Sequence, residues 1–341
     1  MELRNRIFYT LKPIIPRFMQ LILRRKLVRF QMERCKDVWP IDDQAGAAPA
    51  GWTGWPDGKR FALVLTHDVD TARGFGRCLA LADVEERLGF RSSFNFVPLR
   101  YAIRDEVLTT LRGRGFEIGV HGLYHDGKYY ESRDIFQERA KKINLYLKKW
   151  ECTGYRAPCM LHKLDWFHDL HIEYDASTFD TDPFEPNSCG ARTIFPFIVT
   201  GGGAKHRYVE MPYTMPQDFT LFILMRERNI DVWRRKLEWV VRHGGVVLMN
   251  THPDYMNMNG QACGREEYPA GFYEQILRHI QDAYQGQFWH VLPRDLARYW
   301  VRTAQDTHRD ACALRMLVPA KQAGAAVGTS QIINPEGGSR P

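Results

Sequence analysis

FALVLTHDVD, residues 61–70, begins as an apolar run and ends in ionisable side chains. FALVLT has the composition of a buried strand, and His67, Asp68 and Asp70 come at its end. In an extended segment, residues two apart point to the same side, so both carboxylates can face one site. We interpret His67 as a residue that shapes the turn rather than as a metal ligand.

The same pattern recurs twice further along the chain. FEIGV (116–120) is followed by His121 and His125, and VVLMN (246–250) is followed by His252. In a parallel β/α barrel the carboxyl ends of the strands meet at one rim, where active sites are built. We therefore expect side chains that are distant in the sequence to become neighbours there.

Residues 60–302 alternate short apolar runs with longer helical patterns, which indicates repeated β-α units and an α/β fold. We predict strands at 61–66, 92–97, 116–120, just before Arg156, and at 172–177, 208–213, 246–250 and 289–292. We predict helices near 76–88, 105–114, 132–149, 231–243, 271–284 and 294–301.

The segments outside this region differ in composition. Residues 1–40 hold ten Lys/Arg against three Asp/Glu and so carry the whole net charge of +7, which predicts a basic, partly amphipathic arm. Residues 41–59 are rich in Gly, Ala and Pro and predict a linker loop. Residues 303–341 predict a C-terminal extension that is largely disordered.

Composition excludes several classes of protein. A chain of 341 residues with 44% hydrophobic and 26% charged residues is neither disordered throughout nor fibrous. Its seven cysteines include no C-x-x-C pair, which argues against a disulfide framework and a structural zinc site. We find no signal peptide or membrane-spanning run. We therefore expect a cytoplasmic protein.

The polar residues at the predicted strand ends match a catalytic metal site. H-x-x-x-H and D-x-D are each common in structural positions, so only their combination favours a site. His121 and His125 would share one face of a helical turn. One carboxylate with two imidazoles is the ligand set of a catalytic zinc ion, and the second aspartate remains free to act as a base. We predict a divalent metal ion, Zn²⁺, as cofactor.

Five motifs in order resemble those of the polysaccharide deacetylase (NodB-homology) superfamily. They are THDVD (66–70), HGLYH (121–125), Arg156-Ala157-Pro158, YDAS (174–177) and His252, and the resemblance covers about residues 60–300. The resemblance implies a distorted β/α barrel of about seven strands. It also implies a metal-dependent hydrolase that removes N-acyl groups, mostly from amino sugars.

The resemblance implies a role for each matching residue. The metal ligands would be Asp70, His121 and His125. Asp68 would be the general base, and Arg156 would pair with Asp68 and keep it ionised. His252 would be the general acid, and Asp175 would support His252 from behind.

We therefore predict an N-deacylase, most simply an N-deacetylase, of an amino sugar in a glycan or lipid-linked saccharide. One alternative is another amide hydrolase, either a deformylase of a polyprenyl-phosphate aminosugar or an enzyme that opens a small cyclic ureide. The second alternative is a non-catalytic carbohydrate-binding barrel, whose expected mark would be the loss of a ligand, base or acid.

The basic arm allows two interpretations. Met19, Leu23, Leu27 and Phe30 make one helical stripe among many Lys and Arg residues, which is typical of a helix at a membrane interface. Residues 1–36 would then contact the anionic inner face of a membrane. Alternatively, the arm packs along the barrel. We expect no nucleic-acid partner, because no recognition motif accompanies the charge.

Several further polar residues have structural interpretations. Asp180 and Asp182 could form a glycosidase pair, but TFDTDPF is typical of a turn. Glu210 and Asp218 could line a sugar pocket, although packing is the simpler role. We expect three further histidines at the surface: His162, His168 and His171.

Overall fold

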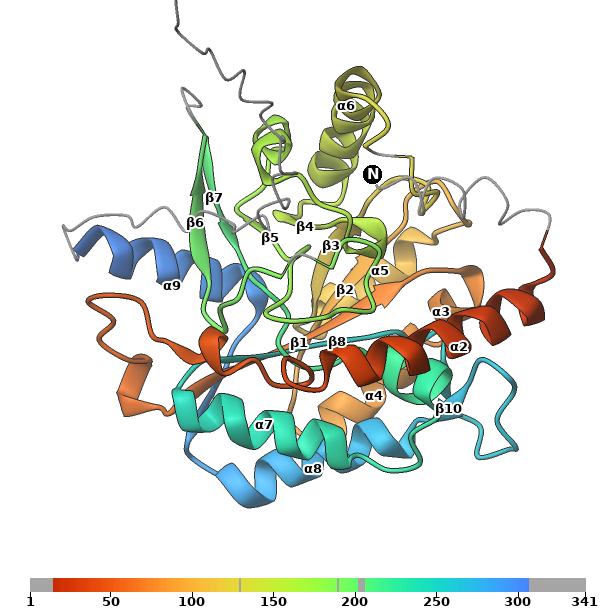
Figure 1. Cartoon of the computed structure of the whole chain (residues 1–341). Helices are drawn as coiled ribbons and strands as arrows, with labels where there is room; N and C mark the ends of the chain where they lie inside the picture. Colours follow the sequence, from red (N-terminus) through yellow and green to blue (C-terminus); the bar gives the residue numbers. More distant parts are fainter. Residues whose placement is uncertain (1–14, 129, 189, 202–205, 307–341) are drawn as a thin grey trace, which may run out of the picture.

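The computed structural model describes residues 15–128, 130–188, 190–201 and 206–306. These residues form a curled sheet with helices on its outer side (Figure 1). The main sheet of this described part has nine strands: β1 (Phe61–Val69), β2 (Ser93–Phe96), β3 (Glu117–His121), β4 (Gly154–Arg156), β5 (Tyr174–Asp175), β6 (Phe197–Thr200), β7 (Arg207–Glu210), β8 (Val246–Thr251) and β11 (Phe288–His290).

Strand β1 is the centre of this sheet. It pairs in parallel with β11 at its start, with β2 at its end and with β8 from Ala62 to His67. From β2 the order continues β3-β4-β5-β7-β6, and β6 alone is antiparallel to its neighbour. All nine residues of β1 are buried, which explains why its apolar run does not alternate with polar residues.

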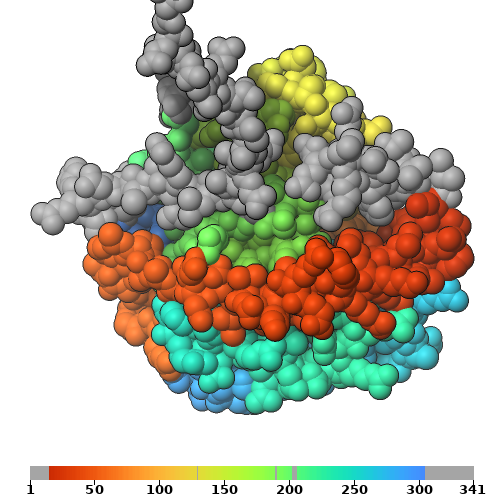
Figure 2. All heavy atoms as spheres, in the orientation of Figure 1, coloured from red at the N-terminus to blue at the C-terminus, as the bar shows by residue number. Residues whose placement is uncertain are grey.

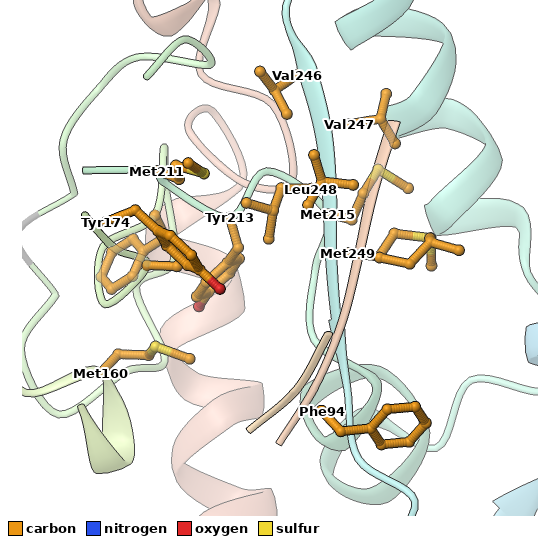
Figure 3. Close-up of a cluster of buried hydrophobic side chains, with 14 of the residues drawn as sticks. Phe94, Met160, Tyr174, Met211, Tyr213, Met215, Val246, Val247, Leu248 and Met249 are labelled. Atoms are coloured by element: carbon orange, nitrogen blue, oxygen red, sulfur yellow. The ribbon is translucent and has the colours of Figure 1, made fainter. Parts of the chain in front are cut away.

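The barrel closes irregularly between β7 and β8. The backbone N–H groups of Thr214 and Met215 both donate to the carbonyl of Leu248, at 3.1 Å. The core fills the space beside this seam, where Tyr213 and Met215 lie next to Leu248 (Figure 3). The predicted distorted α/β barrel is confirmed: seven parallel strands form it, β6 adds a hairpin partner to β7, and β11 extends the pairing of β1.

Helices cover the outside of the sheet, and each predicted helix is present. They are α4 (Cys78–Arg87), α5 (Asp105–Gly113), α6 (Arg133–Lys149), α7 (Asp231–His243), α8 (Gly271–Tyr284) and α9 (Pro293–Asp306). Helix α6 begins where the side chain of Ser132 accepts a hydrogen bond from the N–H of Ile135, at 3.2 Å. The structure adds short elements: α3 (Ala72–Phe75), β9 (Met256–Asn257), β10 (Tyr268–Pro269), four 3-10 turns, η1 (Asp43–Gly46), η2 (Pro56–Gly58), η3 (Pro158–Met160) and η4 (Leu164–Asp169), and a π-helix, η5 (Phe219–Met225).

The N-terminal region packs onto the barrel. Helix α2 (Arg17–Cys35) and the chain after it form a band across one face, between segments drawn in green and in teal (Figure 2). Residues 41–59, expected as a linker loop, contain η1 and η2. There the buried indole of Trp55 donates to the carbonyl of Gly244 at 2.7 Å. Residues 1–14 and 307–341 lie outside the described part, so the disorder predicted for most of 303–341 is not tested.

Two expectations drawn from composition can be compared with the described residues. None of the described helices is long and apolar enough to cross a membrane. Four of the cysteines that the structure describes are free thiols: Cys35, Cys78, Cys152 and Cys263.

Candidate active site

The predicted residues gather at one end of the barrel because each lies at the carboxyl end of a strand. Asp68 lies on β1 and Asp70 follows that strand directly. His121 and Arg156 are the last residues of β3 and β4, and His252 comes directly after β8. All five side chains are buried, so their charges interact with little screening by water.

Asp70, His121 and His125 form a candidate metal centre. Of the described residues, only these three make a cluster of possible ligands, with one ligand atom from each within 4.8 Å of the others. The Nε2 atoms of His121 and His125 lie 3.4 and 3.1 Å from Oδ1 of Asp70. Tetrahedral ligands about 2.0–2.1 Å from zinc are about 3.3 Å apart. The spacing therefore fits a small divalent cation.

The protonation states of these side chains also suit a cation. Oδ1 of Asp70 is buried and accepts no hydrogen bond from the described residues. Burial would raise the pKa of Asp70, but His125 and His121 outweigh burial and hold it well below its usual range. Burial lowers the pKa of His125, which favours the neutral imidazole. An ionised carboxylate and a neutral imidazole are the forms that bind metals.

The backbone fixes which nitrogen of His121 faces the cluster. Its Nδ1 lies 3.1 Å from the carbonyl oxygen of Arg156. Because a carbonyl only accepts hydrogen bonds, Nδ1 carries the hydrogen and Nε2 keeps its lone pair. Nε2 is also the atom that lies near Asp70.

The two histidines are not joined by a helical turn, so that expectation was wrong. Strand β3 ends at His121, and the described residues after it, 122–128, form irregular chain. Gly122 and His125 both have positive φ, of 63° and 56°. These left-handed residues turn the loop back on itself. Glycine adopts this conformation freely, but histidine is strained there, which is a frequent property of functional sites.

Asp68 is held by a buried network. Its Oδ1 accepts from Nη1 of Arg156 at 3.1 Å and from Asn95 at 3.0 Å, and its Oδ2 accepts from Asn250 at 2.9 Å. Burial would raise the pKa of Asp68, but Arg156 and His121 hold it below its usual range. We did not foresee the two asparagines, although a polar residue within an apolar strand run was a signal for each.

His252 is oriented by Asp218 rather than by Asp175. Its Nδ1 lies 2.7 Å from Oδ1 of Asp218. Burial would lower the pKa of His252, but the carboxylate of Asp218, with those of Asp70 and Asp68, raises it to about 10. These carboxylates therefore favour the protonated imidazole, and Nε2 is the nitrogen left to donate a proton.

The supporting role expected of Asp175 is wrong because its side chain has other partners. Its Oδ1 accepts from the hydroxyl of Ser177 at 2.6 Å, and its carboxyl also hydrogen-bonds Glu210. Burial and the neighbouring Glu210 carboxylate raise the pKa of Asp175 well above its usual range. Asp175 and Glu210 thus form a buried carboxyl pair within the barrel wall.

Asp254 is a third residue, after the two asparagines, that the sequence analysis did not foresee. Its Oδ2 accepts the backbone N–H of Asp70 at 2.9 Å, and its Oδ1 accepts the hydroxyl of Thr71. Asp254 therefore fixes the backbone of a candidate metal ligand. Its position two residues after His252 was the available signal.

One cavity of about 750 Å³ is lined by five of the candidate residues: Asp68, Asp70, His121, His125 and His252. Its walls include η5, the loop around Glu185 and, unexpectedly, the inner side of α2. A cavity of this size suits a ligand as large as a saccharide. Several polar side chains other than the candidate catalytic ones also line it: Arg17, Gln20, Arg24, Gln31, Arg73, Arg100, Glu185, Gln217 and Glu266.

The remaining polar residues have structural roles. His67 is buried between Glu85 and Thr251, at 2.9 and 2.8 Å, so it packs within the sheet rather than shaping a turn. Asp180 pairs with Lys236 at 2.5 Å, which gives no support to a glycosidase pair. His162 is buried, so the expectation that it lies at the surface was wrong.

Comparison with known proteins gives structural matches only. No protein-family model and no curated protein matches the chain. Among solved structures, the chain is similar to a protein assigned as a polysaccharide deacetylase from Mycobacterium smegmatis (TM-score 0.56, 18% identity, 76% of this chain and 96% of that one). It is also similar to one from Pseudomonas aeruginosa PAO1 (TM-score 0.55, 15% identity, 73% and 93%) and to PuuE allantoinase (TM-score 0.57, 13% identity, 79% and 98%). The chain therefore has the fold of these proteins, as the motifs predicted.

Proposed function

We propose that this protein is a metal-dependent hydrolase that removes an N-acyl group, most simply N-acetyl, from an amino sugar of a glycan or lipid-linked saccharide. One observation carries the proposal. An ionised carboxylate, Asp68, and a protonated imidazole, His252, line the same cavity as a three-ligand cluster that fits a divalent cation. Base, acid and ligands are the complete set that hydrolysis of an amide requires.

The chain's own residues divide the proton transfers between them. Zn²⁺ bound by Asp70, His121 and His125 would supply polarisation of the amide carbonyl and a lower pKa for the attacking water. Asp68 accepts a proton from that water, and Arg156 with its two asparagine partners keeps the carboxylate ionised and fixed. His252 gives its Nε2 proton to the departing amine, because an amide anion is too poor a leaving group.

The alternatives predict different products. The fold is shared with an allantoinase, so opening of a cyclic ureide needs a direct test. The cavity of about 750 Å³ exceeds what a small ring fills, which favours a saccharide. A non-catalytic carbohydrate-binding barrel would retain binding without product.

The test uses the purified full chain with added Zn²⁺, Co²⁺ or Mn²⁺. N-acetylated amino-sugar oligosaccharides, an N-formyl amino sugar and allantoin are offered separately, and release of acetate, release of formate and ring opening are measured. We expect acetate. Formate or ring opening alone would replace the proposed substrate, and glycan binding without any product would contradict catalysis.

Two variants test the assigned roles. Asp68→Asn and His252→Ala should each lower kcat by about 10²–10⁴-fold while the bound metal per chain is unchanged. His171→Ala, at an exposed histidine, is the matched control and should keep full activity. Full turnover in either active-site variant would refute its role.

A further inference from the structure

Helix α2 is fixed to the barrel on both sides of the cavity. Leu21 and Val28 are buried on its inner face. On one side Nε of Arg25 donates to the carbonyl of Ile223 in η5, at 2.9 Å. On the other, the side-chain amide of Gln31 donates to the carbonyl of Pro183, at 3.1 Å. The helix is therefore a structural wall of the site.

The outer face of α2 is apolar and exposed. Nine large hydrophobic side chains are exposed in the described part of the chain, and six belong to this helix. Their exposed fractions lie between 42% and 57%: Phe18, Met19, Ile22, Leu23, Leu27 and Phe30. Their spacing spreads them over about half of the helix circumference, as a broad apolar stripe that also contains Lys26, Arg29 and Glu33. Of the stripe expected from the sequence, Met19, Leu23 and Phe30 face outward, whereas Leu27 is exposed but also lines the cavity. A different face of α2 packs on the barrel, as one interpretation of the arm expected, and contact with a membrane stays a prediction.

Cations accompany this apolar stripe. Lys26, Arg29 and Arg34 are exposed on the same helix, and within the described residues none of them forms an ion pair. The guanidinium group of Arg34 lies 4.2 Å from the ring centre of Phe30, so the charge sits directly beside the apolar surface. Large apolar side chains mixed with unpaired Lys and Arg are typical of helices that lie in the interface of an anionic bilayer.

A second copy of the chain fits this face less well. In a symmetric dimer both copies contribute the same patch, so the cations Lys26 and Arg29 of one copy would be brought near the cations of the other. Like charges brought together at an interface repel one another. An anionic lipid surface satisfies the apolar and the cationic groups together.

The cavity contains further unpaired cations. The guanidinium groups of Arg24, Arg73 and Arg100 line it, and no carboxylate of the described residues lies within 4.0 Å of them. Arginine in such a position suits a phosphate or carboxylate group of a ligand.

We infer that α2 docks on an anionic lipid bilayer through Phe18, Ile22, Leu23 and their apolar and basic neighbours, so that the cavity it walls is held at the membrane surface. The ligand class that this placement implies is a saccharide carried on an anionic lipid, and that class rests on the proposed function. The docking surface itself does not depend on any reaction.

The test is flotation of the full chain with vesicles of phosphatidylcholine, with and without phosphatidylglycerol. Deletion of α2 is unsuitable because the helix forms a wall of the site. We expect flotation with the anionic vesicles only. Phe18→Ser/Ile22→Ser/Leu23→Ser should lower the bound fraction by about tenfold or more. Leu145→Ser removes a residue that is 68% exposed on α6, and this matched control should float like the original protein.

Charge reversal is an independent test that leaves the apolar side chains unchanged. Lys26→Glu/Arg29→Glu should abolish flotation, whereas Lys142→Glu/Lys148→Glu on α6 makes the same change in net charge and should preserve it. Equal effects of the two pairs would mean that net charge alone drives binding, and would overturn the inference. The inference would also be overturned if the original protein did not float, or if the triple serine variant floated as well as the original protein.

A second copy of the chain is the other possible partner of this face of α2. Light scattering of the free protein tests for such a dimer. A stable dimer that the triple serine variant dissociates would make this face a contact between copies and would overturn membrane docking. Acetate release from a soluble oligosaccharide is measured on the same preparations. If the protein floats but hydrolyses nothing, the docking surface is supported and the proposed function is contradicted. If it hydrolyses the oligosaccharide but does not float, the proposed function is supported and the docking surface is contradicted.

Discussion

Asp218 and His252 are joined by two hydrogen bonds although 34 residues separate them. Oδ1 of Asp218 lies 2.7 Å from Nδ1 of the imidazole, and Oδ2 accepts the backbone N–H of His252 at 2.8 Å. The hydroxyl of Tyr268 donates to the same Oδ2 at 3.1 Å. One carboxylate therefore fixes the ring, the backbone and the charge of the proposed acid.

Asp218→Asn should shift the alkaline limb of the pH profile for kcat to lower pH. The acid is active while His252 is protonated, so activity is lost as pH rises through its pKa. Removing the carboxylate removes the main cause that raises this pKa to about 10. A bound cation lowers the pKa in both proteins, so the measured quantity is the difference between their alkaline limbs.

Asp175→Asn is the control for that comparison. Asp175 bonds Ser177 and Glu210, so this variant should leave the alkaline limb in place. An alkaline limb that moves with Asp175 and not with Asp218 would contradict the assignment of Asp218 as the positioning residue.

Loss of a candidate ligand should empty the metal centre. We expect His121→Ala and Asp70→Asn to reduce bound Zn²⁺ per chain well below that of the original protein, because two remaining ligands hold zinc poorly. Plasma mass spectrometry on protein prepared without chelators measures the ratio. Added Zn²⁺ should raise Tm in the original protein only. His171→Ala should bind metal normally, and a full complement of zinc in His121→Ala would contradict the proposed centre.

Arg156→Met should destabilise the fold by about 3–5 kcal/mol, because it leaves the buried carboxylate of Asp68 without its cation. Urea unfolding measures the change. Arg156→Met/Asp68→Asn removes both charges and should be more stable than Arg156→Met alone. A double variant as unstable as the sum of the two single variants would show that the pair is not coupled.

The sequence predicted the barrel well because its signals are local. Each apolar run became a strand, since a buried parallel strand needs apolar residues on both faces. The metal cluster could be predicted from the sequence for a related reason. Asp70 and His121 lie at the ends of strands, and the carboxyl ends of the strands of a barrel meet at one rim.

The partners of these residues depend on packing between distant segments. Asp218 precedes the π-helix η5, which the periodicity of the sequence did not predict. It reaches His252 only because the chain after β7 crosses to β8. Asp175 had the expected sequence position but lies against Glu210. The sequence also did not indicate which face of α2 packs on the barrel, because the buried residues Leu21 and Val28 lie outside the more obvious apolar stripe.

Glu117 should make stability depend on pH. Its Oε1 accepts the hydroxyl of Tyr174 at 2.8 Å and its Oε2 accepts the N–H of Arg294 at 3.1 Å. Burial nevertheless raises the pKa of Glu117 from 4.5 to about 7. The folded state therefore holds a proton that the unfolded state releases, so this stabilisation is complete below pH 4.5 and is lost as pH rises to about 7.

Comparison with Glu117→Gln isolates this contribution from those of other buried acids. The stability of the original protein minus that of the variant should fall by about 3 kcal/mol between those two pH values, since each pKa unit corresponds to about 1.4 kcal/mol. Urea unfolding across the pH range measures the difference. Glu106→Gln, at an exposed position of α5, should give a difference that is nearly independent of pH. A pH-independent difference for Glu117→Gln would mean that the pKa of this carboxyl is the same in the folded and unfolded states, so that its two hydrogen bonds offset its burial.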